Sequence, residues 1–228
     1  MVHKCCTLIL FLCLVPSVLY GETANTYIGV APGFTYLDPY TLVSEKNLLK
    51  DIPSSDSKDR LNVVIEIPAG RTEKWEVSKP NGVLEWNFKK GKPRLVKYIG
   101  YPGNYGMVPQ TLLPKELGGD GDPLDAIVLA PPMLRGSIAS GKLIGVLKLT
   151  DDKEMDDKLI TVSPNSPFYK VDSLEELDEK FPGITDILKI WFLNYKGPGK
   201  IKFKGFGEIA EAEEILKKAV EYFQIKFQ

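Results

Sequence analysis

The chain has 228 residues, of which 43% are hydrophobic and 26% are charged, as is typical of a single globular domain with a sizeable core. Lysine and arginine together number 29, and aspartate and glutamate number 30. These values argue against a disordered or fibrous protein, and they leave no excess of positive charge to attract nucleic acid or anionic membranes.

The first 21 residues differ in composition from the rest of the chain. Lys4 precedes an apolar run over residues 5–19, and Gly21 follows it. This order predicts a secretory signal peptide over residues 1–21, cleaved near Gly21. An uncleaved anchor and an organelle presequence are the alternatives, although Pro16 and the shortness of the run argue against an anchor. We expect an exported protein, periplasmic or secreted, with a cytoplasmic or organellar location as the alternative.

All cysteines and the histidine fall inside this N-terminal segment. They are Cys5, Cys6, Cys13 and His3. A cleaved chain would contain neither residue type, which excludes disulfides, cysteine nucleophiles, Ser-His-Asp triads and zinc sites built on Cys and His. Catalysis would then rely on carboxylates, Lys, Arg, Tyr, hydroxyl groups or metal ions.

Residues 22–59 form an extension rich in Pro, Ser, Thr and Asp, with one helix-like stretch at Val43–Leu49. We expect it to pack over a core that begins at residue 60. The first core strand is expected at Leu61–Ile67, a β-branched run that Pro68 ends. Further strands are expected at Lys74–Val77, Val83–Phe88, Ala126–Ala130, Leu143–Leu149, Leu159–Val162 and Ile201–Phe203.

Short turns separate several of these strands. They stand at Asn81-Gly82, Lys90-Gly91 and Gly118-Gly119. Turns at such intervals favour antiparallel pairing and a barrel-like sheet over a parallel one. Helices are expected late in the chain, at Leu174–Lys180, Ile184–Asn194 and Glu208–Phe223. The pattern therefore predicts an α+β protein that is mainly β.

Three carboxylates, Asp120, Asp122 and Asp125, stand close together just before an apolar strand. Carboxylates this close repel each other unless a cation neutralises them, and an unpaired charge beside a buried strand is costly. Such oxygen ligands suit magnesium, calcium or manganese. A solvated acidic turn is the alternative, and an EF-hand loop is a poor match because its acids are out of register.

A second acidic group, Thr150–Lys158, follows the strand expected at Leu143–Leu149. Taken alone it is typical of an exposed loop. Two carboxylate-rich loops at the ends of neighbouring strands could, however, enclose several divalent ions, as phosphoryl-transfer sites do.

Cations and phenols stand near these acids in Gly- and Pro-rich surroundings. They are Arg94, Lys97, Tyr98, Tyr101, Tyr105, Tyr195 and Lys196. Each alone is typical of a solvated side chain or a packed ring. Together with carboxylates and metals they suit a small phosphate polyanion, since Arg and Lys neutralise phosphate oxygens and Tyr hydroxyls donate to them.

The run Asp120-Gly121-Asp122-Pro123-Leu124-Asp125 resembles the signature of soluble (family I) inorganic pyrophosphatases. Other motifs of that family follow in its order: Val64–Pro68, Lys74–Glu76, Gly91–Arg94, Asn104–Gly106, Thr150-Asp151, Asp156–Lys158 and Tyr195-Lys196. The match covers about residues 61–223, and several motifs in order are more specific than one alone. The resemblance implies an inorganic diphosphatase, which hydrolyses pyrophosphate to two phosphates with a water activated between Mg²⁺ ions and with no covalent enzyme intermediate.

The resemblance also implies a role for each site residue. The metal ligands would be Asp120, Asp125, Asp151 and Asp156, and Asp122 would take the proton from the attacking water. Pyrophosphate or product phosphate would be held by Lys74, Arg94, Tyr105, Tyr195 and Lys196. The same cavity would be lined by Glu66, Glu76 and Lys158. Several Mg²⁺ ions would bind per site, with Mn²⁺ or Zn²⁺ as substitutes and Ca²⁺ as an inhibitor.

The implied fold is a small, five-stranded, mostly antiparallel OB-like β-barrel with peripheral helices, in a catalytic domain over residues 60–228. Homo-oligomers are implied as well, and the bacterial-type core length favours a hexamer over a dimer. One departure from the family is Lys153-Glu154-Met155, where many members have a glycine-containing loop. The spacing between Asp151 and Asp156 is kept.

Two other functions fit parts of the pattern. An exported module that binds divalent cations would explain the acidic loops, but it would not need Arg94, Tyr105, Tyr195 and Lys196. A general phosphatase or nucleotidase would act on organic phosphates, but no aromatic-lined base pocket is visible in the sequence. We expect pyrophosphate as the small-molecule partner and no stable membrane span after removal of the signal.

Overall fold

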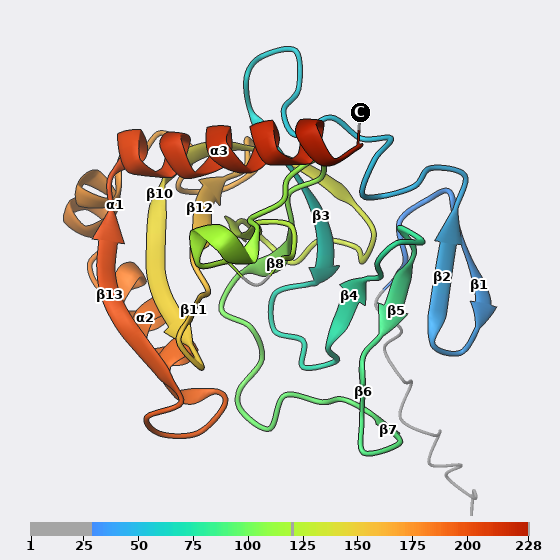
Figure 1. The fold of residues 1–228 in the computed structure, drawn as a ribbon. Coiled ribbons are helices and arrows are strands. Elements are labelled where there is room, and N and C mark those ends of the chain that lie inside the picture. Colours follow the sequence, from blue (N-terminus) through green and yellow to red (C-terminus); the bar gives the residue numbers. More distant parts are fainter. Residues whose placement is uncertain (1–28, 120, 228) are drawn as a thin grey trace, which may run out of the picture.

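The structure is a computed structural model that describes residues 29–119 and 121–227, so the expected signal peptide and Asp120 lie outside the described residues. A closed barrel of five strands forms its centre (Figure 1). The barrel strands are β3 (Leu61–Ile67), β8 (Asn104–Met107), β9 (Asp125–Leu129), β12 (Lys158–Val162) and β10 (Ile138–Asp151). Each pairs with the next in this order, and β10 pairs with β3 to close the ring. The expected five-stranded barrel is confirmed.

One pair in the barrel is parallel and the other four are antiparallel, so the barrel is mostly antiparallel, as expected. Strands β9 and β12 run in the same direction, with Asp125 beside Lys158 and Leu129 beside Val162. Strand β10 lies between β9 and β12 in the sequence. Strand β12 pairs antiparallel with β10, and its other edge pairs parallel with β9. As a consequence, the first residues of β9 and β12 lie at the same end of the barrel.

Strand β10 is longer than expected, at 14 residues. Its first part pairs with β3, and its last part pairs with β13 (Ile201–Gly207). The register shifts between Leu143 and Gly145, where φ of Gly145 is +152°. A Cβ at Gly145 would lie 2.5 Å from Cδ1 of Leu174, so glycine permits both the bend and the close approach of the helix.

The extension contributes a β-hairpin to a second sheet beside the barrel. In order, the strands of this sheet are β1 (Phe34–Asp38), β2 (Thr41–Ser44), β5 (Leu84–Trp86) and β4 (Trp75–Val77). The helix-like stretch expected at Val43–Leu49 is wrong, because strand β2 ends at Ser44 and turns follow it. Leu42 of β2 is fully buried in a cluster with Trp75, and this burial favours strand pairing with β5.

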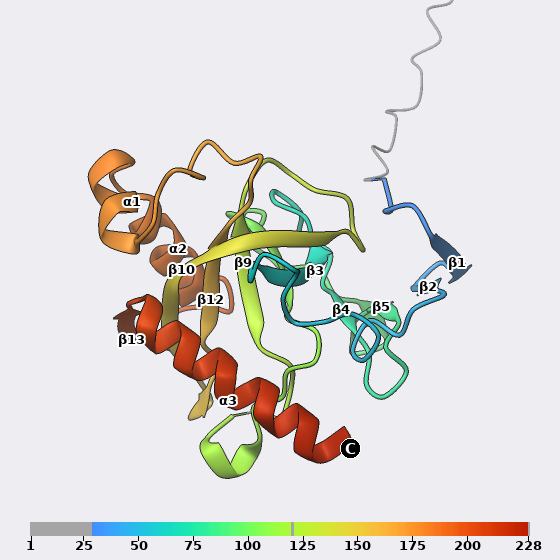
Figure 2. The ribbon, with the colours of Figure 1, turned by 90° about the horizontal axis from the view of Figure 1, so that it is seen from above.

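The remaining short strands are β6 (Phe88–Lys89), β7 (Lys92–Pro93) and β11 (Glu154–Met155). The helices are η1 (Lys115–Leu117), α1 (Leu174–Lys180), α2 (Ile184–Asn194) and α3 (Ile209–Phe227). Helices α1 and α2 have the expected bounds, and α3 extends to Phe227. Figures 1 and 2 show α3 lying across the barrel, where its buried residues include Ala212 and Ala219.

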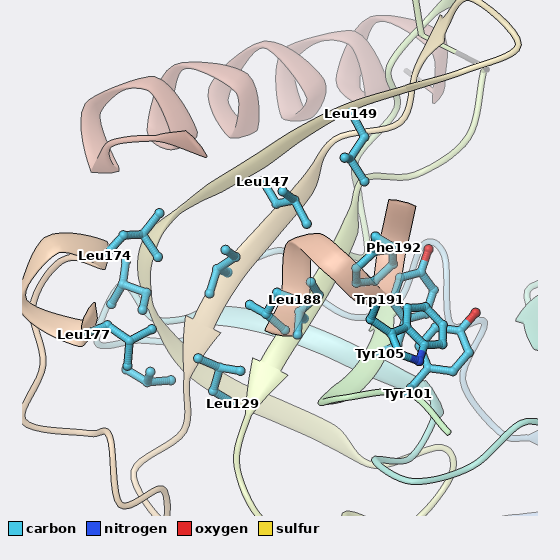
Figure 3. Close-up of a cluster of buried hydrophobic side chains, with 14 of the residues drawn as sticks. Tyr101, Tyr105, Leu129, Leu147, Leu149, Leu174, Leu177, Leu188, Trp191 and Phe192 are labelled. Carbon is cyan, nitrogen blue, oxygen red and sulfur yellow. The ribbon is translucent and has the colours of Figure 1, made fainter. Parts of the chain in front are cut away.

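Aromatic rings form one side of a large core cluster. Figure 3 shows Tyr101, Tyr105, Trp191 and Phe192 gathered there, and the ring centroids of Tyr101 and Trp191 lie 4.3 Å apart. Trp191 also stacks on Tyr195 at 4.7 Å. These contacts fix the rings of Tyr105 and Tyr195, which belong to distant segments of the chain.

Candidate active site

Strand directions bring three carboxylates to one end of the barrel. Asp125 is the first residue of β9 and lies beside Lys158, the first residue of β12. Asp151 is the last residue of β10, which runs antiparallel to β12. Asp156 stands two residues before Lys158. The two acidic loops therefore meet although they are far apart in the sequence.

Lys158 is buried between two of these carboxylates. Its side chain is 2% exposed, and its Nζ donates to Asp125 Oδ2 at 2.6 Å and to Asp156 Oδ1 at 2.7 Å. Burial disfavours the charged form of Asp125, but the ammonium groups of Lys158 and Lys74 outweigh it and lower the pKa of Asp125. Burial opposes the charge of Lys158 in the same way, and the two carboxylates outweigh it and raise its pKa.

A cleft of about 570 Å³ lies at this end of the barrel. The residues singled out in the sequence that line it are Glu66, Lys74, Glu76, Arg94, Tyr105, Asp122, Asp125, Asp151, Asp156, Tyr195 and Lys196. Lys158, Lys97, Tyr98 and Tyr101 are not part of its lining. Asp120 lies outside the described residues. One cavity therefore combines the carboxylates of both acidic loops with cations and phenols.

The cation Lys74 and two phenols form one wall of this cleft. Lys74 precedes β4 and is 8% exposed, with its Nζ 3.0 Å from Glu76 Oε1 and 4.9 Å from the ring centroid of Tyr105. Burial opposes the charge of Lys74, but Tyr101 and the nearby carboxylates outweigh it and raise its pKa. Burial also raises the pKa of Tyr105 and of Tyr195. These phenols therefore keep their protons and can donate hydrogen bonds to an anion.

Glu66 differs from the other carboxylates of the cleft. It lies in β3 and is buried, and its Oε1 accepts a hydrogen bond from the backbone N–H of Val77 at 2.7 Å. Burial raises the pKa of Glu66 to about 8. The side chain is therefore mostly neutral at pH 7 and adds little to the negative charge of the site.

Two further lysines pair with site carboxylates. Lys196 forms an ion pair with Asp151. Lys79, which follows β4, forms an ion pair with Asp122, and its Nζ is 3.3 Å from the backbone oxygen of Gly121. Sequence reasoning missed Lys79, because 42 residues separate it from Gly121 and no local pattern links the two segments.

Sequence reasoning missed other cleft residues as well. The indole N–H of Trp86 donates to the backbone oxygen of Arg94 at 3.0 Å, and Nδ2 of Asn87 donates to Glu76 Oε2 at 2.6 Å. Trp86, Asn87 and Phe88 line the cleft. Strand pairing places these residues there, so the sequence contains no local signal for them beyond their closeness to Arg94.

The donor set fits a hard divalent cation. Oδ2 of Asp156 is buried and has no hydrogen-bond partner within the described part of the chain. A buried carboxylate oxygen without a partner is costly, and a cation would satisfy it. All candidate ligands are oxygens, which magnesium prefers. Within residues 29–119 and 121–227, no three Asp, Glu, His or Cys side chains converge on a preformed metal site.

The family model for inorganic pyrophosphatase matches residues 63–224. The chain belongs to this family. The mitochondrial inorganic pyrophosphatase of Saccharomyces cerevisiae is 38% identical over 170 residues, which cover 65% of this chain and 54% of the yeast protein. The inorganic pyrophosphatase of Ralstonia nicotianae is 34% identical over 180 residues, which cover 75% of this chain and 95% of that protein. The solved structure of the Helicobacter pylori inorganic pyrophosphatase is 33% identical, with a TM-score of 0.64 over 76% of this chain and 98% of that chain.

These matches confirm the resemblance to soluble (family I) inorganic pyrophosphatases. The pyrophosphatase match begins in β3 and ends in α3, so it includes the barrel except the first two residues of β3, and all the residues that line the cleft. The β1–β2 hairpin lies outside it. In the part of the chain that the structure describes, no helix is both long enough and apolar enough to cross a membrane.

Proposed function

We propose that this chain hydrolyses inorganic pyrophosphate to two phosphates, with a catalytic domain over residues 60–228. The observation that carries this proposal is the single cleft, in which carboxylates from two acidic loops face Lys74, Arg94, Tyr105, Tyr195 and Lys196. Membership in the family supports it. A small anion with several negative charges requires this combination of metal ligands, fixed cations and neutral hydroxyl donors.

The proposed metal ligands are Asp120, Asp125, Asp151 and Asp156, for several Mg²⁺ ions. Mn²⁺ or Zn²⁺ would substitute, and Ca²⁺ would inhibit. When bound, Mg²⁺ lowers the pKa of a coordinated water and neutralises phosphate oxygens. The buried unpaired oxygen of Asp156 supports the presence of a cation there.

The protein side chains have separate roles in the proposed reaction. Asp122 accepts the proton of the attacking water as a general base. Lys74, Arg94 and Lys196 neutralise the charge that develops on the leaving phosphate, while the hydroxyls of Tyr105 and Tyr195 donate to its oxygens. Water attacks phosphorus directly, so no covalent enzyme intermediate forms. Glu66 and Glu76 line the same cleft. Lys158, which we expected in that lining, is instead buried between Asp125 and Asp156.

We propose a cleavable signal peptide over residues 1–21, an extension over residues 22–59, and export to the periplasm or outside the cell, with a cytoplasmic or organellar location as the alternative. We further propose a homo-oligomer, with a hexamer favoured over a dimer.

Hydrolysis of an organic phosphate is a rival for one structural reason. The sequence shows no aromatic-lined base pocket, yet the rings of Trp86 and Phe88 line the cleft. The ring of Trp86 is held in place by the fold, because it stacks on Trp75 and its indole N–H donates to the backbone oxygen of Arg94. We therefore expect pyrophosphate to be preferred over ATP.

The test is phosphate release by the chain from Glu22 onward. Pyrophosphate and ATP are compared in the presence of Mg²⁺, Ca²⁺ or a chelator. We expect rapid release from pyrophosphate with Mg²⁺, and we expect Asp122→Asn to lower kcat by about 100-fold or more without unfolding the protein. No release by the folded protein would refute the enzymatic proposal, and Ca²⁺ retention without hydrolysis would favour the cation-binding module. Equal release from ATP would favour a general phosphatase. Full activity of Asp122→Asn would refute the assignment of the base.

A further inference from the structure

The hairpin between Asp151 and Asp156 contains the Lys153-Glu154-Met155 departure from the family pattern. Asp151 pairs with Glu154 and Thr150 pairs with Met155, so Asp152 and Lys153 form a two-residue turn. Their φ angles are +46° and +77°, as a primed hairpin turn requires. This hairpin is therefore well defined although its turn has no glycine.

Met155 connects the hairpin to the loop that leads to Asp122. Its backbone N–H donates to the backbone oxygen of Gly118 at 2.8 Å. A Cβ placed on Gly118 would lie 3.7 to 3.9 Å from Cγ, Sδ and Cε of Met155, so the Met155 side chain lies beside Gly118. Glu154 adds an ion pair with Lys115 at 3.8 Å, but both side chains are exposed and the pair is weak.

Two backbone hydrogen bonds at Leu113 close the base of the loop on which Gly118 and Asp122 stand. The N–H of Leu113 donates to the backbone oxygen of Asp122 at 3.1 Å, and the N–H of Gly121 donates to the backbone oxygen of Leu113 at 3.0 Å. Gly118 itself ends η1, and its N–H donates to Lys115. Met155 thus contacts a closed loop that includes the proposed base.

We propose that Met155 is a positioning residue, which couples the loop containing Asp122 to the hairpin flanked by Asp151 and Asp156. The coupling keeps the two acidic loops at a fixed separation before metal and substrate bind. This inference rests on the proposed pyrophosphatase function. It assigns a role to a segment in which this chain departs from the family pattern.

A proline at Met155 can test the coupling. In a two-residue hairpin the pair that closes the turn, Asp151 and Glu154, exchanges the hydrogen bonds, so the N–H of Met155 points outward. Met155→Pro therefore removes the bond to Gly118 without removing a bond of the hairpin. Lys153→Gly is the matched control, because it changes the same hairpin and keeps that N–H.

We expect Met155→Pro to lower kcat about fivefold, the effect of losing one backbone hydrogen bond, with KM for pyrophosphate changed less than about twofold. The Mg²⁺ dissociation constant of the substrate-free protein, measured by titration calorimetry, should rise by a similar factor of about five. Lys153→Gly should leave both quantities unchanged. Equal values for Met155→Pro and Lys153→Gly would overturn the inference, whereas a wild-type chain with neither activity nor Mg²⁺ binding would refute the proposed function.

A second variant keeps the test decisive if the proline prevents folding. Met155→Ala retains the N–H and removes the side-chain atoms that lie beside Gly118. Hydrogen exchange of the backbone amides between Leu113 and Asp122 should then be faster than in Lys153→Gly. Identical exchange in the two variants would overturn the inference.

Discussion

Removing the buried cation Lys158 should lower the free energy of unfolding. The decrease should be larger without Mg²⁺ than with it. Lys158 is 2% exposed and bonds Asp125 and Asp156 at 2.6 and 2.7 Å. The variant Lys158→Met keeps most of the side-chain volume but leaves two close carboxylates without their shared cation. Breaking a buried ion pair in this way costs about 3 to 5 kcal/mol. For a domain of this size, the loss lowers Tm by about 10 °C.

Thermal unfolding followed by circular dichroism measures this loss. We expect the full decrease in Tm in the presence of a chelator and a smaller decrease in the presence of Mg²⁺, because bound cations would neutralise the same carboxylates. Lys148→Met is the control, since Lys148 bonds the partly exposed Glu211 at 2.8 Å and should contribute less than about 1 kcal/mol. Equal unfolding temperatures of the two variants in chelator would refute a stabilising role of Lys158, and so would a Tm deficit of Lys158→Met that Mg²⁺ leaves unchanged.

Two other substitutions test the fold around the cleft. Because burial raises the pKa of Glu66 from 4.5 to about 8, the folded state retains a proton that the unfolded state loses. As pH rises from 4.5 to about 8, the contribution of Glu66 to the free energy of unfolding therefore falls, by up to about 1.4 kcal/mol per pH unit. In urea unfolding without metal, the stability of Glu66→Gln relative to the wild type should increase as pH rises from 5 to 8. A decrease in this difference would show that burial does not raise the pKa of Glu66. Gly106→Ala should lower the free energy of unfolding by about 3 kcal/mol in the same assay, because the alanine Cβ would lie 1.8 Å from the backbone oxygen of Val64. An unchanged urea midpoint would show that β8 can shift away from β3.

Local patterns predicted the parts of this fold that depend on neighbours in the sequence. The β-branched run Leu61–Ile67 is β3, and the periodic segments Leu174–Lys180 and Ile184–Asn194 are α1 and α2. Strand β8 was missed because Asn104–Met107 is short and contains a glycine. Its conformation depends on pairing with both β3 and β9. The helix expected at Val43–Leu49 failed for a similar reason, since pairing of β2 with β5 and burial of Leu42 beside Trp75 outweigh the local helix preference.

The sequence by itself determined the chemistry of this protein. Its motifs specified the family, the acidic residues and the cations, because residue type and order can be read without coordinates. Tertiary structure decided which of these groups meet. The parallel pairing of β9 and β12 placed Lys158 between Asp125 and Asp156, and the ends of β4 and β11 brought Lys79 and Met155 to the loop of Asp122. These contacts join segments that are distant in the chain, so they depend on closure of the barrel and no local pattern encodes them.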